Sequence, residues 1–141
     1  MIPCSNRIQE ILEWVNGDCI ADIGCDHAYV VCNAILNHQS KKGYACDVAQ
    51  GPLDNAKKTI EDNELSDFVS CRLLDGIQGL NEDVDQIIIC GMGAKLIIDI
   101  LSKGNLHSGL RFLLSSHKDD FILREYLRDH NIHIVREKND L

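Results

Sequence analysis

The chain has 141 residues, of which 45% are hydrophobic and 26% are charged. These values are typical of a folded globular protein and exclude the disordered and collagen-like classes, and the length suits one domain. With 14 Lys and Arg against 22 Asp and Glu, the formal net charge is −8. Because affinity for a phosphate backbone comes from clustered basic side chains, we do not expect this chain alone to grip nucleic acid tightly.

Seven cysteines are present, but the odd count and the absence of any Cys-x-x-Cys pair favour free thiols in a reducing compartment. The same pattern argues against a metal site. The N-terminus has no signal-peptide pattern, and no apolar stretch reaches the ~20 residues of a membrane span. We therefore expect a cytoplasmic protein with no metal and no membrane contact, whose oligomeric state the sequence leaves unknown.

Hydrophobic periodicity predicts helices that alternate with short apolar strands. The first helix is expected over 6–15, with Ser5 or Asn6 as its N-cap. Strands are expected over 19–24, 43–48, 67–73, 84–90, 110–115 and 132–136, and further helices over 28–36, from Gly51-Pro52 onward, over 95–103 and over 121–130.

Three consecutive isoleucines in the fourth of these strands indicate burial on both faces, as in a parallel sheet. The alternation of strand and helix predicts an α/β fold, with a doubly wound, mostly parallel, Rossmann-like sheet. Ligands of such sheets bind at the carboxyl ends of the strands, near the point where strand order reverses. The residues that end the first four strands are therefore the candidates for a site.

The first strand ends in Asp22-Ile23-Gly24-Cys25. Gly24 permits a sharp turn before a helix N-terminus, but the second and third glycines of a dinucleotide fingerprint are absent. An acidic residue two positions before the glycine suits a cationic ligand, such as the sulfonium and ammonium groups of S-adenosylmethionine. A tight structural turn is the alternative interpretation.

Two further carboxylates follow the next strands. Asp47, before Val48, comes at a spacing close to the ~20 residues at which an acid meets a ribose hydroxyl in a βαβ nucleotide site. Asp75, before Gly76 and Ile77, can accept a hydrogen bond from an adenine amino group while apolar neighbours sandwich the base. A helix cap is the alternative for each carboxylate. Together the three strand ends favour a nucleoside with a cationic tail.

The fourth strand leads into Gly91-Met92-Gly93-Ala94, which is poor in side chains. Small residues at this position leave room for a planar base opposite the reactive end of a cofactor. The alternative is a tight turn with Met92 in the core.

These strand ends lie in segments that resemble a bacterial family, the class I S-adenosylmethionine-dependent tRNA (adenine(22)-N1)-methyltransferases. The similarity runs from about Ser5 to the end of the chain, and its most specific strings are GCDH, DVxxGPLxNA and GMGxxLI. It is carried by ADIGCDHAYV (21–30), DVAQGPLDNAKKTI (47–60), RLLDGI (72–77) and DQIIICGMGAKLI (85–97).

The resemblance implies a class I methyltransferase fold and methylation of an adenine N1 in tRNA. Asp26, His27 and Tyr29 are implied at the substrate mouth as the catalytic candidates, with Asp26 near the adenine amino group. His27 is either a hydrogen-bond donor to the cofactor carboxylate or a plain helix-start residue. Cofactor contacts are implied for Arg7, Asp22, Gly24, Cys25, Asp26, His27, Asp47, Val48, Asp75, Gly76, Ile77, Gly91, Met92 and Gly93.

Three positions depart from the family pattern. Ala28 and Ala94 replace glycines, changes that we expect to be tolerated where φ stays negative. Ser115-Ser116-His117 stands where the family usually has a proline, which could reshape the rim beside the acceptor base.

The family also has a seventh strand and a helical coiled-coil domain that helps to grip tRNA. Because this chain stops at Leu141, we expect one methyltransferase domain over residues 1–141 that lacks the last strand and the coiled coil and holds tRNA weakly. Two other functions stay open, a methyltransferase acting on a small molecule and a non-catalytic cofactor-binding or interaction module.

Overall fold

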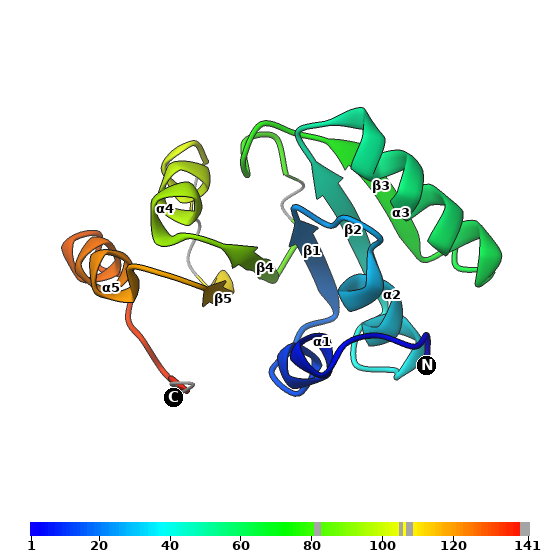
Figure 1. Cartoon of the computed structure of the whole chain (residues 1–141), viewed down its shortest axis with the longest axis horizontal. Helices are drawn as coiled ribbons and strands as arrows, with labels where there is room; N and C mark the ends of the chain where they lie inside the picture. The colour runs from blue at the N-terminus through cyan, green and yellow to red at the C-terminus, as the bar shows by residue number, and fades with distance from the viewer. Residues whose placement is uncertain (81–82, 105, 107–108, 139–141) are drawn as a thin grey trace.

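Five parallel strands form one sheet in the order β3-β2-β1-β4-β5 (Figure 1). The computed structural model describes residues 1–80, 83–104, 106 and 109–138. Strand order reverses between β1 and β4, so the doubly wound parallel sheet predicted from the sequence is confirmed. The strands are β1 (Cys19–Ile23), β2 (Lys42–Asp47), β3 (Val69–Leu73), β4 (Gln86–Met92) and β5 (Arg111–Ser116).

Helices cover both faces of the sheet, with α1, α2 and α3 on one side and α4 and α5 on the other (Figure 1). Successive residues of β4 explain this arrangement, because Ile88 packs with the α1–α3 cluster whereas Ile87 and Ile89 pack with the α4–α5 cluster. The isoleucine run is therefore buried on both faces, as predicted. The helices are α1 (Asn6–Leu12), α2 (Tyr29–Leu36), α3 (Gln50–Asp62), α4 (Ala94–Ser102) and α5 (Asp120–Asp129).

The first helix and the fourth strand have bounds whose differences from the sequence prediction bear on the site. The first helix has Ser5 as its N-cap, accepting a hydrogen bond from the Ile8 N–H at 3.3 Å, but it ends at Leu12 instead of residue 15. The fourth strand starts later and continues through Gly91 and Met92, which the sequence placed in a loop. An irregularity in register between Cys90 and Met92 lets the strand continue past the glycine.

The predicted sixth strand over 132–136 is wrong. Residues 132–138 form neither strand nor helix in the structure. Their side chains reach back to α1 and α5 instead, with the Arg136 guanidinium 4.3 Å from the centroid of the Trp14 ring and Lys138 Nζ 3.3 Å from Glu10 Oε1. A β-strand needs a partner for its backbone groups, and this segment runs beside helices.

The cysteines form no disulfide, and four of them, Cys19, Cys25, Cys32 and Cys46, are buried in the apolar interior. Within the described residues, no helix is both long and apolar enough to cross a membrane. No group of three or more His, Cys, Asp or Glu side chains in those residues could hold a metal ion.

Candidate functional site

Backbone hydrogen bonds bring the carboxyl ends of β1, β2 and β3 together. Gly24, just after β1, donates its N–H to the Cys46 carbonyl at 2.9 Å, and Leu74, just after β3, donates to the Asp47 carbonyl at 2.9 Å. The sheet thus places the turn after β1, the end of β2 and the loop after β3 along one edge, next to the reversal of strand order. This edge is where a doubly wound sheet binds ligands.

The turn after β1 contains three residues with left-handed backbone, Gly24 (φ 72°), Asp26 (φ 49°) and Ala28 (φ 61°). The condition on which the sequence predicted that Ala28 would be tolerated, a negative φ, is not met. Its N–H donates to the Cys25 carbonyl at 2.7 Å, and this tight turn sets the left-handed conformation at the start of α2. An alanine in that conformation costs about 1–2 kcal/mol, so the family glycine is replaced here at a cost in strain.

The Asp22 carboxyl is buried between β1 and the first turn of α2. Its pKa is raised to about 7, mainly by burial and in part by the nearby Asp47 charge, and a hydrogen bond from the Val31 backbone N–H opposes the shift. The group is therefore poised between its neutral and charged forms near neutral pH. A cation placed beside it would favour the carboxylate.

Cys25 follows in the same turn and is buried. Burial raises the pKa of its thiol, and the charges of Asp22 and Asp47 raise it further. Because the thiol stays protonated at neutral pH, Cys25 is a small packing residue of the turn and no nucleophile.

Asp47 lies half-buried at the end of β2, with Oδ1 accepting a hydrogen bond from the Ala49 N–H at 3.0 Å. The N-cap of α3 is Ala49, so the capping alternative for Asp47 is wrong. Two apolar side chains flank this carboxylate in the open, Val48 at 69% and Leu73 at 58% exposure. Exposed apolar surface beside a carboxylate is typical of a face that receives a ligand.

Asp75 lies in the loop after β3, where no helix begins among the described residues, so its capping alternative is wrong as well. Its Oδ1 is 3.1 Å from Lys103 Nζ, and this lysine also lies 3.2 Å from Asp99. Gly76 follows with φ 69°, and the Ile77 side chain is buried against Gly104. Ile77 therefore presents backbone, and not side chain, to the site.

Met92 connects the two halves of the sheet. It is half-buried against the α4–α5 cluster, and its terminal methyl lies over Gly24, filling the space that a Cβ on Gly24 would need. The sequence left open that Met92 packs in the core. Part of its side chain does so, whereas its terminal methyl lies on the turn after β1. Gly91 and Gly93 flank it, so the end of β4 carries one large side chain between two small residues.

The three predicted catalytic residues lie together. His27 and Tyr29 stack with ring centroids 5.4 Å apart, and His27 Nε2 is 3.8 Å from Asp26 Oδ1. Asp26 and His27 are exposed, as residues at the mouth of a site must be. Arg7, in contrast, donates from Nη2 to Ser115 Oγ at 3.1 Å and so ties α1 to the end of β5.

The methyltransferase domain family matches residues 4–139 of this sequence. The chain belongs to that family. It is 35% identical over 140 residues to the tRNA (adenine(22)-N(1))-methyltransferase of Bacillus subtilis (strain 168), covering 96% of this chain and 59% of that relative.

Two solved structures are similar in fold and sequence. TrmK of M. capricolum in complex with S-adenosyl-homocysteine superposes with a TM-score of 0.82 at 32% identity, over 91% of this chain and 58% of that one. Sp1610 of Streptococcus pneumoniae in complex with S-adenosyl-L-methionine superposes with a TM-score of 0.82 at 29% identity, and the match covers 91% of this chain and 62% of that one. The chain therefore spans about three fifths of the length of these relatives, and the family resemblance seen in the sequence is confirmed.

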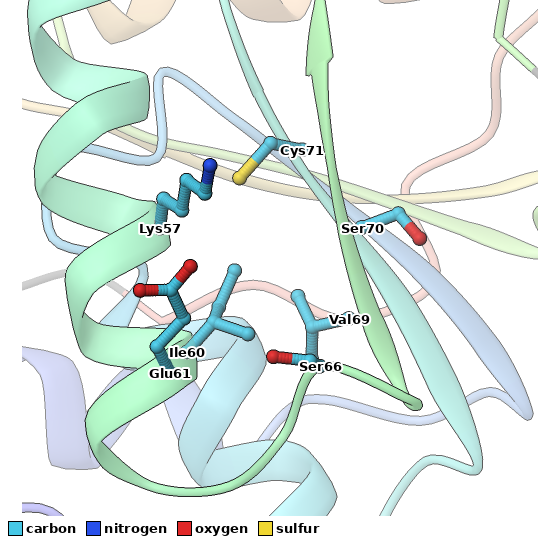
Figure 2. Close-up of a pocket in the computed structure, with 7 residues that line it drawn as sticks. All are labelled: Lys57, Ile60, Glu61, Ser66, Val69, Ser70 and Cys71. Carbon is cyan, nitrogen blue, oxygen red and sulfur yellow. The ribbon is translucent and has the colours of Figure 1, made fainter.

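A cavity of about 430 Å³ lies elsewhere on the methyltransferase domain, between α3 and the outer strand β3 (Figure 2). It follows the first half of β3, away from the carboxyl ends. No predicted site residue lines it; its walls are Lys57, Ile60, Glu61, Ser66, Val69, Ser70 and Cys71.

Lys103 is the residue of this site that the sequence reasoning missed. Its position four residues after Asp99 predicts the helical ion pair between them. The contact with Asp75 depends on how the loop after β3 folds against the end of α4, and no local pattern encodes that.

We predict that replacing Asp22 by Asn changes the pH dependence of stability. The pKa of Asp22 is higher in the folded than in the unfolded chain, so its contribution is present below pH 4 and is lost as pH rises through about 7. At pH 8 the Asp22→Asn variant should be more stable than wild type, by up to about 4 kcal/mol, whereas at pH 4 the two should match. Urea unfolding across pH measures this, with exposed Asp67→Asn as the control; parallel profiles would contradict it.

Because the backbone at Ala28 is left-handed, we predict that a β-branched residue at this position strongly destabilises the protein. Ala28→Val should lower the free energy of unfolding by about 2 kcal/mol or more, because valine tolerates positive φ poorly and the site is fully buried. Ala49→Val is the matched control, since Ala49 is exposed with extended backbone and should change by less than about 0.5 kcal/mol. Equal effects of the two substitutions would refute the strained turn.

Proposed function

We propose that this domain binds S-adenosylmethionine at the carboxyl ends of β1 to β4 and methylates N1 of an adenine, at position 22, in tRNA. The observation that carries the proposal is the row of Asp22, Asp47 and Asp75 along one sheet edge beside the exposed side chains of Val48 and Leu73. Relatives named for this activity or solved with this cofactor or its product match nearly the whole chain.

The residues of the edge fit the parts of such a cofactor. Asp22 gains its charge more easily beside the ammonium and sulfonium groups. Asp47 has Oδ2 without a hydrogen bond in the described residues, so it can accept from a ribose hydroxyl. Val48 and Leu73 supply apolar surface for an adenine ring, whose amino group and ring nitrogen meet Asp75 and the backbone at Gly76.

The bound cofactor supplies an electrophilic methyl group, and the chain's own residues have to align the acceptor with it. Adenine N1 presents an in-plane lone pair, so the attack requires no prior deprotonation, and positioning carries most of the catalysis. Met92 between Gly91 and Gly93 borders the space for the base. Asp26 accepts a hydrogen bond from the adenine amino group, raises the electron density at N1 and stabilises the positive charge that reaches the ring.

His27 and Tyr29 form an aromatic wall beside Asp26. Their stacked rings are suited to contact a base or the carboxylate end of the cofactor. We assign residues 1–141 to one methyltransferase domain acting on tRNA in the cytoplasm, with a weak hold on the RNA because the chain carries a net charge of −8.

The same net charge supports a second candidate, a methyltransferase that acts on a small molecule. Such an enzyme needs no phosphate contacts, and an acidic surface does not hinder it. The two candidates share the cofactor site and differ in the acceptor.

Cofactor binding tests the shared part. Wild type should bind S-adenosylmethionine in calorimetry, and Asp47→Ala should weaken the affinity by about 10-fold to 100-fold, as expected when hydrogen bonds from a charged group to the ribose are lost. Asp67→Ala removes an exposed carboxylate away from the edge and should leave the affinity unchanged. Binding of NAD in place of S-adenosylmethionine would overturn the assignment.

Transfer of a labelled methyl group separates the two acceptors. We expect transfer to an unmodified tRNA transcript with adenine at position 22 and none to the same transcript with guanine there. Asp26→Ala should retain cofactor affinity and lose turnover. A chain that binds the cofactor normally but methylates neither transcript would refute the tRNA proposal and leave the small-molecule enzyme.

A further inference from the structure

The carboxyl edge of the sheet is divided in charge. The half formed by β1, β2 and β3 carries Asp22, Asp47 and Asp75, whereas the half formed by β4 and β5 carries exposed basic side chains. These are Lys95 in the first turn of α4 and Lys118, with His117, in the turn after β5. These exposed lysines suit an anionic ligand better than the carboxylates of the first half do.

Most lysines of the chain form an ion pair with a carboxylate, and Lys95 and Lys118 differ from them in this respect. Within the described part of the chain neither forms an ion pair, although Asp and Glu outnumber Lys and Arg. The lysines that do pair with carboxylates are Lys41, Lys42, Lys58, Lys103 and Lys138.

The side chain of Lys118 lies against Gly93, just after the end of β4. A Cβ placed on Gly93 would lie 3.1 Å from Lys118 Cε and 3.4 Å from its Cγ, so the lysine stem runs across this glycine. The backbone holds the two turns together as well, because Ala94 donates to the Lys118 carbonyl at 3.2 Å and His117 donates to the Met92 carbonyl at 3.1 Å. Lys95 is the residue after Ala94, so the start of α4 that carries it is hydrogen-bonded to the turn that carries Lys118.

Asp119 and Asp120 follow Lys118 in the sequence, but among the described residues neither forms an ion pair with Lys95 or Lys118. Asp120 accepts a hydrogen bond from Ser116 Oγ at 2.5 Å, and Asp119 is half-buried at the start of α5. No acidic residue stands in the first turn of α4. An ammonium group without an ion pair gains charge-assisted hydrogen bonds when an anion binds beside it.

We propose that Lys95 and Lys118 hold a phosphate of the RNA substrate next to the adenine that enters beside Met92. This inference rests on the proposed function and adds the residues that place the polynucleotide. The acidic half of the edge receives the cationic cofactor, and the basic half receives the polyanionic acceptor. A lysine contact to phosphate binds independently of base sequence and strengthens at low salt.

The test uses the 141-residue chain, a tRNA transcript with adenine at position 22, and fluorescence anisotropy from 25 to 200 mM salt. Lys118→Gln and Lys95→Gln should each weaken RNA binding by about 10-fold at low salt and reduce the slope of log affinity against log salt by about 1. Because both lysines hold the same phosphate, the double variant should also lose about 1, and not 2, from the slope. Affinity for S-adenosylmethionine should stay at the wild-type value in all three.

Lys57→Gln is the matched control, because Lys57 is an exposed lysine without an ion pair in the described residues and lies on α3, away from the edge. Lys118→Arg should keep the wild-type slope. If Lys57→Gln lowers the slope as much as Lys118→Gln, or if wild type shows no salt-dependent RNA binding, the proposal is overturned. A normal slope pattern without methyl transfer would retain the phosphate contact and refute only the proposed function.

Discussion

Burial of the Asp22 carboxyl at the end of β1 is the constraint on which the site depends. Water is excluded there because β1 is flanked by strands on both sides and covered by α2, and this raises the pKa of the carboxyl to about 7. The charged form is therefore costly in the empty protein. A cationic ligand at the same edge would offset that cost, so this edge of the sheet favours cationic over neutral or anionic ligands.

The surrounding backbone is built around this carboxyl. The turn from Gly24 to Ala28 uses left-handed conformations to bring the first turn of α2, with the Val31 N–H, back toward Asp22. Met92 closes over Gly24 from the neighbouring strand. The reversal of strand order between β1 and β4 thus joins a carboxylate-bearing half of the edge to a lysine-bearing half, and we place the methyl transfer at their junction.

Much of the fold could be predicted from the sequence because its signals are local. Ile87, Ile88 and Ile89 required burial on both faces of a parallel sheet, and the acidic residues at strand ends then had to meet along one edge. The predicted sixth strand failed because alternating apolar residues do not supply a partner strand. The continuation of β4 through Gly91 was not predicted, because the register irregularity that permits it depends on pairing with β5.

The sequence predicted which residues lie at the site better than it predicted how they are arranged. Asp26, His27 and Tyr29 are adjacent in sequence, so their proximity was expected. The φ of Ala28 depends on the tight turn around it, the Lys103 contact depends on loop packing, and the link from Arg7 to Ser115 joins residues at opposite ends of the chain.

Proton release on cofactor binding would report on the charge of Asp22 itself. Calorimetry of S-adenosylmethionine binding at pH 6, in buffers of different ionisation enthalpy, counts the protons exchanged. Wild type is expected to release close to one proton, because Asp22 is mostly protonated before binding and charged afterwards, and Asp22→Asn is expected to release none. Equal proton counts for the two proteins would contradict this expectation.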